Sequence, residues 1–124
     1  MNVYTYKDQK MKNFNPITSE ITELHAGICS ALADPRRILI LYALGERNLN
    51  VSDLAQVVSI SQPAASRHLK TLRAQGLVTA ARQGASVEYS LADARLIDAL
   101  DLLRSVLHNH LSYRASLLVE DTSQ

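Results

Sequence analysis

The sequence contains a single cysteine, Cys29, and no long apolar run. One cysteine cannot form an intrachain disulfide, and it is too few for a cysteine-rich zinc module. No stretch approaches the roughly 18 consecutive apolar residues that a membrane span requires, and residues 1–15 are polar and basic, without the apolar core of a secretory signal. At 124 residues the chain suits one compact domain. We therefore expect a single-domain cytoplasmic protein with no membrane partner.

Acidic residues are missing from the middle of the chain. Residues 54–87 contain Arg67, Lys70, Arg73 and Arg82 but no aspartate or glutamate, whereas bases and acids balance before this segment and acids outnumber bases after it. The net charge of +1 therefore conceals a basic segment. Such a segment favours a polyanionic partner, although a solvated basic surface is the simpler alternative.

The first part of the chain predicts two helices behind a flexible arm. Residues 1–16 show no periodicity and predict the arm. Apolar residues then recur at helical spacing and predict a first helix, at Ile21, Leu24, Ile28 and Leu32. Asp34 followed by Pro35 is typical of a capped helix start. We expect this second helix to be apolar nearly all round, buried, and ended by Gly45.

The next segment has the pattern of a helix-turn-helix. Ser52 is expected to cap a short third helix, which the polar residues 59–61 end. Ser61, followed by proline at position 63, caps a fourth helix that ends before Gly76. The inward-facing apolar residues are expected to be Leu54, Val57 and Val58 in the third helix and Ala65, Leu69 and Leu72 in the fourth. Two short helices joined by about three residues form a helix-turn-helix.

Beyond Gly76 the periodicity changes to that of strands. Residues 77–81 and 87–91 predict a β-hairpin with its turn at residues 82–86. Asp93 then caps a final helix of roughly 25 residues. The apolar face of that helix comprises Leu96, Leu100, Leu103, Leu107 and Leu111. Because this stripe is longer than one small domain can cover, we expect a homodimer.

The predicted fold is mainly α with a small β-hairpin. It is a winged helix-turn-helix in the order α-α-α-α-β-β-α, with helices one and five forming the dimer interface. The DNA-binding and dimerisation domain is expected to span residues 17–118, and residues 119–124 are expected to form a C-terminal tail.

Three segments carry a family resemblance. Residues 31–41 have the sequence ALADPRRILIL, residues 61–72 have SQPAASRHLKTL, and residues 76–78 have GLV. In this order they resemble the second helix, the recognition helix and the start of the wing in the ArsR/SmtB family of bacterial repressors. The resemblance covers about residues 17–111 and implies a DNA-binding transcriptional regulator that acts as a repressor. Because one helix contacts too few base pairs to select a gene, we expect a two-fold dimer on an inverted repeat, with half-sites about one turn apart.

The polar residues of the fourth helix are the candidates for contacting bases. Helical spacing places them opposite the buried stripe. Gln62 suits a bidentate pair with adenine, and Arg67 suits guanine or a phosphate. The small residues Ala64 and Ser66 let the helix approach the floor of the major groove. His68 either contacts DNA or holds the helix in place.

Other residues are expected to contact the DNA backbone. Four lie at the start or along the side of the same helix: Ser61, Lys70, Thr71 and Arg73. Arg82 and Gln83, at the hairpin tip, are expected to enter a minor groove or lie along a phosphate, rather than being merely solvated.

The usual inducer sites of the family are missing. Where its arsenite and cadmium sensors carry the pattern Leu-Cys-Val-Cys-Asp-Leu, residues 49–54 have LNVSDL and lack both thiolates. Where its zinc sensors carry an Asp-x-His pair on the last helix, Asp101 is followed by Leu103. We therefore expect no cofactor and no metal site of these types.

Other effectors stay open as alternatives. His108 and His110 point about 200° apart on a helix, so they need ligands from a second subunit, such as His25 or Cys29, to hold a metal. Solvated histidines are the simpler interpretation. Cys29, expected to be a small buried residue, also offers an intersubunit disulfide. A small-molecule metabolite, or no effector at all, fits the sequence equally well.

An enzyme and a protein-interaction module are the two alternatives to a DNA-binding regulator. An enzyme would use His25, His68, His108 or His110 as a general base, with Cys29 or a serine as nucleophile. No glycine-rich phosphate loop, nucleophile elbow or spaced carboxylate pair accompanies them, so we predict that the protein is not an enzyme. A protein-interaction module would use the long last helix and leave the basic segment solvated.

Overall fold

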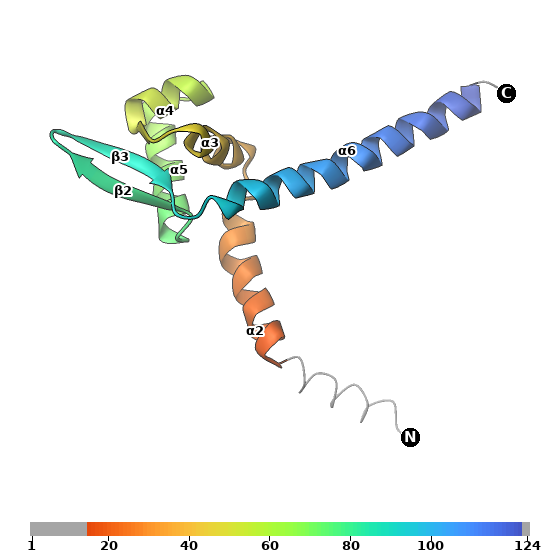
Figure 1. The fold of residues 1–124 in the computed structure, drawn as a ribbon, viewed down its shortest axis with the longest axis horizontal. Helices are drawn as coiled ribbons and strands as arrows, with labels where there is room; N and C mark the ends of the chain where they lie inside the picture. The colour runs from red at the N-terminus through yellow and green to blue at the C-terminus, as the bar shows by residue number, and fades with distance from the viewer. Residues whose placement is uncertain (1–14, 123–124) are drawn as a thin grey trace.

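The helices in the middle of the chain pack with a small sheet into a body, and the first and last described helices project from it (Figure 1). The computed structural model describes residues 15–122. In chain order the elements are α2 (Asn15–Glu23), the π-helical turn η1 (Leu24–Cys29), α3 (Pro35–Glu46), β1 (Leu49–Asn50), α4 (Val51–Val58), α5 (Gln62–Ala74), β2 (Val78–Gln83), β3 (Ser86–Leu91) and α6 (Arg95–Thr122). The predicted order of helices and the hairpin is confirmed, and one short strand, β1, was not predicted.

The ends of the predicted domain differ from expectation. Helix α2 begins at Asn15, so residues 1–14 of the expected arm lie outside the described residues and only its last two are seen, in a helix. At the other end α6 continues to Thr122, so residues 119–122 extend the last helix instead of starting a tail. Within residues 15–122, no helix has the length and apolar character needed to cross a membrane.

Helix α3 supplies the centre of the core. Its predicted cap is confirmed, since Asp34 accepts a hydrogen bond from the backbone N–H of Arg36 at 2.9 Å. Ile40, Leu41 and Leu44 are buried. The prediction that α3 is buried nearly all round is wrong for Leu39, which is 54% exposed.

The expected end of α3 at Gly45 is also wrong. The helix continues to Glu46, and Gly45 lies within it. A Cβ built on Gly45 would lie 2.9 Å from Cγ1 of Ile97 in α6. The missing side chain therefore lets the start of α6 pack closely on α3.

Helix α4 starts earlier than the sequence predicted. Its cap is Asn50, whose side-chain oxygen accepts from the backbone N–H of Asp53 at 2.8 Å, and Ser52 lies inside the helix. The difference arises because residues 49 and 50 form β1, which pairs with β3 and fixes the chain direction before the helix begins. Leu54 is buried as predicted, whereas Val57 is 53% exposed and does not turn inward.

The sheet has the strand order β1-β3-β2, antiparallel throughout. Strand β2 begins one residue later than predicted and ends two residues later, because Arg82 and Gln83 pair with Val87 and Ser86. The turn therefore contains only Gly84 and Ala85. Gly84 has a φ of +63°, and Ala85 is not among the residues with positive φ, which is the arrangement of a type II′ hairpin turn.

Helix α6 leaves most of its length uncovered. Leu100 is buried, and Leu96 and Ile97 pack against the core. Beyond them the predicted stripe is exposed, at 63% for Leu103 and 52% for Leu111. Figure 1 shows α6 extending away from the body.

The two candidate caps of α4 can be compared directly. Asn50→Ala removes the acceptor for the Asp53 N–H and should lower the free energy of unfolding by about 1 kcal/mol. Ser52→Ala, within the helix, should change it by less than about 0.5 kcal/mol. Urea unfolding followed by circular dichroism measures both. A larger loss for Ser52→Ala than for Asn50→Ala would contradict the assignment of the cap.

Candidate nucleic-acid interface

The turn between α4 and α5 orients the candidate recognition helix. Ser59 ends α4 in the left-handed conformation, with a φ of 62°, and the N–H of Ile60 bonds to the carbonyl of Ala55 at 3.0 Å. Ser61 then caps α5 by accepting from the N–H of Ala64 at 3.2 Å, as the sequence predicted. The two helices therefore meet across residues 59–61 as a helix-turn-helix.

The far end of α5 is closed by Gly76. This glycine has a φ of +72°, and the N–H of Leu77 bonds to the carbonyl of Leu72 at 3.0 Å. Leu72 and Leu77 are both buried beside this bond, which is the contact that usually accompanies such a cap. The chain then turns directly into β2, so the hairpin lies next to the helix (Figure 1).

One face of α5 is buried and the other is open. The predicted inward residues Ala65, Leu69 and Leu72 have at most 1% of their surface exposed. The opposite face exposes five of the candidate residues: Gln62, Ser66, Arg67, Lys70 and Arg73. The helix therefore presents a polar, basic surface that is held in position by its apolar side.

The cations of this surface are not neutralised by neighbours. Within residues 15–122, none of Arg67, Lys70, Arg73 and Arg82 forms an ion pair, whereas Arg36, Arg95 and Arg104 each pair with an aspartate within three residues. The positive charge of the basic segment is thus available to a ligand.

Two candidate residues are not on the open face. Ala64 is 7% exposed and His68 is 8% exposed. At 100° per residue, both lie on the edge of α5 that turns toward the buried stripe. The prediction that they take part in DNA contact is therefore not favoured, and the alternative for His68, that it holds the helix, agrees with its surroundings.

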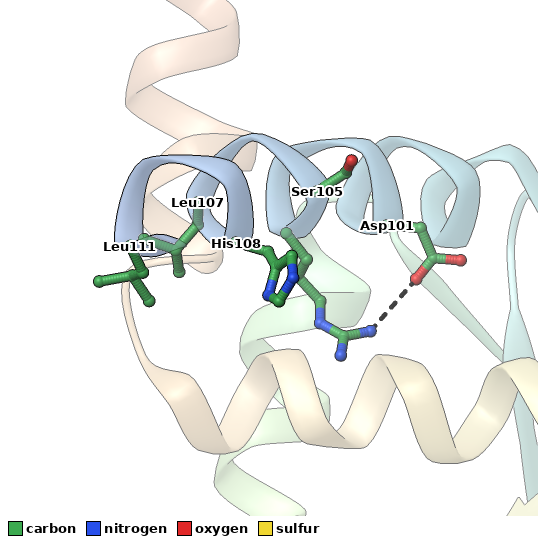
Figure 2. Close-up of a pocket in the computed structure, with 6 residues that line it drawn as sticks. Asp101, Ser105, Leu107, His108 and Leu111 are labelled. Atoms are coloured by element: carbon green, nitrogen blue, oxygen red, sulfur yellow. Dashed lines mark ion pairs between the residues drawn. The ribbon is translucent and has the colours of Figure 1, made fainter. Parts of the chain in front are cut away.

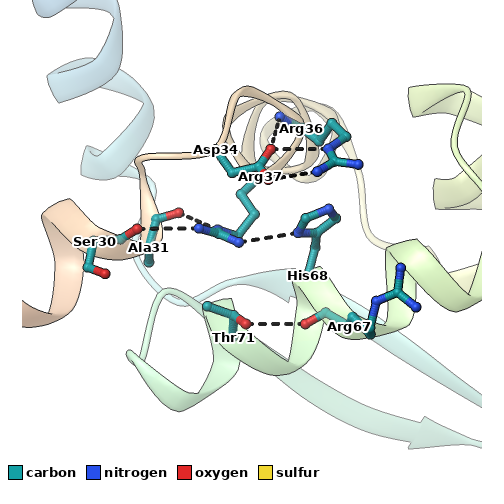
Figure 3. A network of polar contacts seen from close by, with 8 residues as sticks. All are labelled: Ser30, Ala31, Asp34, Arg36, Arg37, Arg67, His68 and Thr71. Atoms are coloured by element: carbon teal, nitrogen blue, oxygen red, sulfur yellow. Dashed lines mark hydrogen bonds and ion pairs between the residues drawn. The ribbon is translucent and has the colours of Figure 1, made fainter.

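Arg37 connects His68 to the end of the first helical segment (Figure 3). Its guanidinium donates to the carbonyls of Ala31 and Ser30, and Nη1 lies 3.4 Å from Nδ1 of His68. Since arginine can only donate, Nδ1 must be the unprotonated acceptor, and the histidine is neutral with its proton on Nε2. Burial, above all, lowers the pKa of His68, which agrees with this neutral form.

Two candidate hydroxyl groups, one at the cap of α5 and one within the helix, already form hydrogen bonds. Oγ of Ser61 is the cap acceptor, and Oγ1 of Thr71 donates to the carbonyl of Arg67 at 3.3 Å (Figure 3). Both residues are exposed. Ser61 retains its hydroxyl proton for donation to a phosphate. Thr71 already donates its proton to the carbonyl of Arg67, so it is a weaker candidate for a phosphate contact than the sequence indicated.

The hairpin presents its two tip residues on opposite faces. Side chains alternate along a strand, and paired residues share a face. Arg82 pairs with Val87 and so shares a face with Tyr89, whereas Gln83 points the other way. Tyr89 was not among the predicted site residues. It lines a groove between α5 and β3 together with Ser66, Lys70 and Arg73.

The possible sensor residues are dispersed. His108 lines a shallow hollow on α6 with Asp101 and Ser105, while His110 is not among the residues around it (Figure 2). Across residues 15–122, no three histidine, cysteine, aspartate or glutamate side chains gather in a group that could hold a metal. Cys29 is exposed, so the expectation that it is buried is wrong; its turn, η1, has no buried residue.

A helix-turn-helix with an open basic helix and an adjacent hairpin defines a DNA-binding winged-helix protein. Residues 34–80 match the family described as "Bacterial regulatory protein, arsR family". The nodulation protein NolR of Rhizobium meliloti is 36% identical over 99 residues, covering 80% of this chain and 81% of NolR. The chain belongs to the ArsR family. It is a DNA-binding transcriptional regulator and not an enzyme.

Solved structures agree with this assignment. The crystal structure of Rv0081 from M. tuberculosis has a TM-score of 0.70 and 35% identity, covering 77% of this chain and 96% of that one. The solution structure of the homodimeric winged helix-turn-helix DNA-binding domain Mb0332 from Mycobacterium bovis has a TM-score of 0.69 and 28% identity, covering 77% and 89%. The predicted winged helix-turn-helix fold is confirmed.

Acid should destabilise the fold through His68. Its folded-state pKa lies below the ordinary value of 6.5, so the unfolded chain binds this proton more strongly. The free energy of unfolding therefore falls as the pH decreases through 6.5, and the contribution is fully present above that value. His68→Gln should flatten this dependence in urea unfolding between about pH 7 and pH 5.

A matched variant controls for the other histidines. His25→Gln, at an exposed position, should keep the wild-type pH dependence. Asp34 and Asp93, whose pKa values are lowered to about 2 by hydrogen bonds from Arg36 and Arg95, titrate below this range. Identical slopes for wild type and His68→Gln would show that His68 is not buried as a neutral ring.

Proposed function

We propose that this regulator is a homodimeric repressor that binds an inverted repeat in double-stranded DNA through its two α5 helices. The observation that carries the proposal is the open face of α5, whose cations have no ion-pair partners within residues 15–122. A family member that regulates transcription acts on chromosomal DNA, so we assign it to the cytoplasm.

The proposed contacts divide by chemistry. Gln62, Ser66 and Arg67 lie on the open face of α5 and are assigned to base edges in the major groove. We assign Lys70, Arg73 and the capping Ser61 to phosphate contacts. Thr71 is assigned a minor phosphate contact. Arg82 and Gln83 extend the contact from the hairpin. Ala64 and His68 support the helix from its buried side.

The homodimer is supported by the location of the uncovered apolar side chains. Apart from Leu39 and Val57, every large apolar side chain that is exposed lies on α2, η1 or α6, among the residues described. Apolar surface of this extent is rarely left to water. A two-fold partner that packs α2 and α6 against their copies would cover it and place two recognition helices on one side of the DNA.

The described residues leave a metal, a thiol reaction and a small molecule as alternative effectors of DNA binding. A metal held by His108 or His110 would need ligands from the second subunit, since one copy gathers no set of three among residues 15–122. Cys29 is exposed on η1, within the proposed dimer element, so an intersubunit thiol response stays an alternative. A small-molecule effector, or none, is the simplest proposal.

Binding to DNA should separate specificity from affinity. Gln62→Ala should relax the preference at one base pair, by about 1–3 kcal/mol, because its amide pairs with one base. Lys70→Ala should lower the affinity for all DNA sequences by the same factor. It should also reduce the slope of log K against log salt by about 0.9 per protomer. Fluorescence anisotropy with a random duplex and a duplex selected from a random pool, over a range of salt, measures both.

The control for net charge is Arg95→Ala. It changes the charge as Lys70→Ala does, but Arg95 is paired with Asp93 at the start of α6, so the salt slope should stay near that of the wild type. If the wild type showed no salt-dependent binding to any duplex, the proposal would be rejected.

Two adjacent positions on α6 test the dimer. Val106 is 61% exposed on the apolar arc of the helix, and Ser105, next to it, is about 100° away on the polar arc. Val106→Glu should dissociate the dimer in sedimentation velocity, because it buries an unpaired charge at the interface. Ser105→Glu adds the same charge and should stay dimeric. A monomeric wild type, or equal behaviour of both variants, would exclude this interface.

A further inference from the structure

A groove between α5 and β3 has the features of a binding site for one phosphate of the DNA backbone. Ser66, Lys70 and Arg73 line it from the helix, and Tyr89 lines it from the strand. The groove encloses about 570 Å³, a volume typical of small-molecule sites and sufficient for a phosphate with its neighbouring sugars.

The charge in this groove is of one sign. Arg67 joins Lys70 and Arg73 among the lining residues, and no carboxylate lines it. The nearest acid in the sequence of β3 is Glu88, which alternates to the other face of the strand from Tyr89. Arg82 shares the face of Tyr89 through its pairing with Val87, so the basic surface continues toward the hairpin tip.

Tyr89 brings a neutral hydrogen-bond donor to this basic surface. Its side chain packs against the core, and its strand is paired on both sides, with Leu49 of β1 and Ala80 of β2. Its hydroxyl makes no hydrogen bond to any other residue in the range 15–122. Tyr89 is half-buried, and a tyrosine hydroxyl normally needs a hydrogen-bond partner once it is buried, as it would be against a bound backbone. The ring of Tyr89 lines the same groove as three cations, and its hydroxyl has no protein partner among the described residues.

In a complex with DNA, a backbone phosphate can be the hydrogen-bond partner of the Tyr89 hydroxyl. If α5 lies in the major groove and the hairpin reaches the adjacent minor groove, the backbone that separates the two grooves must pass between them. The groove that contains Tyr89 lies between α5 and strand β3 of the hairpin. We propose that this groove holds a phosphate of that backbone, with the Tyr89 hydroxyl donating to a phosphate oxygen and Lys70 and Arg73 supplying the charge. The inference rests on the proposed binding to DNA and adds a contact that is not on the recognition helix.

Removal of one hydroxyl group tests this contact. Tyr89→Phe keeps the ring and its packing, so thermal unfolding should be unchanged. The variant should bind the selected duplex about ten-fold more weakly per protomer, the value of a hydrogen bond to a charged group. Because no charge is lost, its salt slope should equal that of the wild type, unlike that of Lys70→Ala.

A matched control is available in the same chain. Tyr42→Phe also removes a phenolic hydroxyl, one that donates to Oδ1 of Asp101 at 2.7 Å between α3 and α6. It lies outside the groove and should leave the DNA affinity near the wild-type value.

Neutral phosphates locate the contact. A single methylphosphonate is placed at successive positions along each strand of the duplex. At one position per half-site, this substitution should lower the DNA affinity of the wild type much more than that of Tyr89→Phe. Equal affinities of wild type and Tyr89→Phe, or equal losses at every position, would overturn the phosphate groove while leaving the DNA-binding regulator intact. Absence of salt-dependent binding by the wild type would instead reject the proposed function, and this inference with it.

Discussion

The apolar seam along α5 is the constraint on which the rest of the site depends. Leu69 and Leu72 belong to the same buried cluster as Ile40 and Leu41 of α3, and the cluster continues through Leu54, Leu77 and Val78 into α4, the wing and its entrance. Because one face of α5 is packed tightly into this core, the helix cannot rotate about its axis, and the orientation of its exposed face is fixed. The position of every exposed residue on α5 therefore follows from side chains that never meet the ligand.

Charge is arranged to leave that exposed surface positive. Aspartates at positions 34, 93 and 101 pair with arginines two or three residues away, so these acids are paired within their own segments and not with the cations of α5. The low pKa values of Asp34 and Asp93 are the counterpart of this pairing. Unpaired cations remain where carboxylates are missing from the sequence. The surface potential thus results from the placement of the acids as much as of the bases.

Features decided within a few residues were predictable from sequence. The caps at Asp34 and Ser61, the left-handed Gly76 and the stripe at Ala65, Leu69 and Leu72 all follow from local spacing. Features that depend on distant partners were not. The cap at Asn50 follows from pairing with β3, and the burial of His68 depends on Arg37, 31 residues earlier. Tyr89 could have been suspected only by combining strand alternation with the orientation of α5.

Gly27 lies where the first helical arm, which is proposed to form the dimer, meets the end of the recognition helix. It lies in η1, beside the apolar surface that faces solvent, and a Cβ built there would overlap Oε1 of Gln75, which follows the last turn of α5. The amide of Gln75 can lie over η1 because position 27 has no side chain. A rotation or slide of the first helical arm therefore changes the surroundings of Gln75, and this long, exposed side chain adjusts before the axis of α5 does. The contact between the first arm and the end of α5 is therefore an adjustable one, and the orientation of α5 is set by its buried face instead.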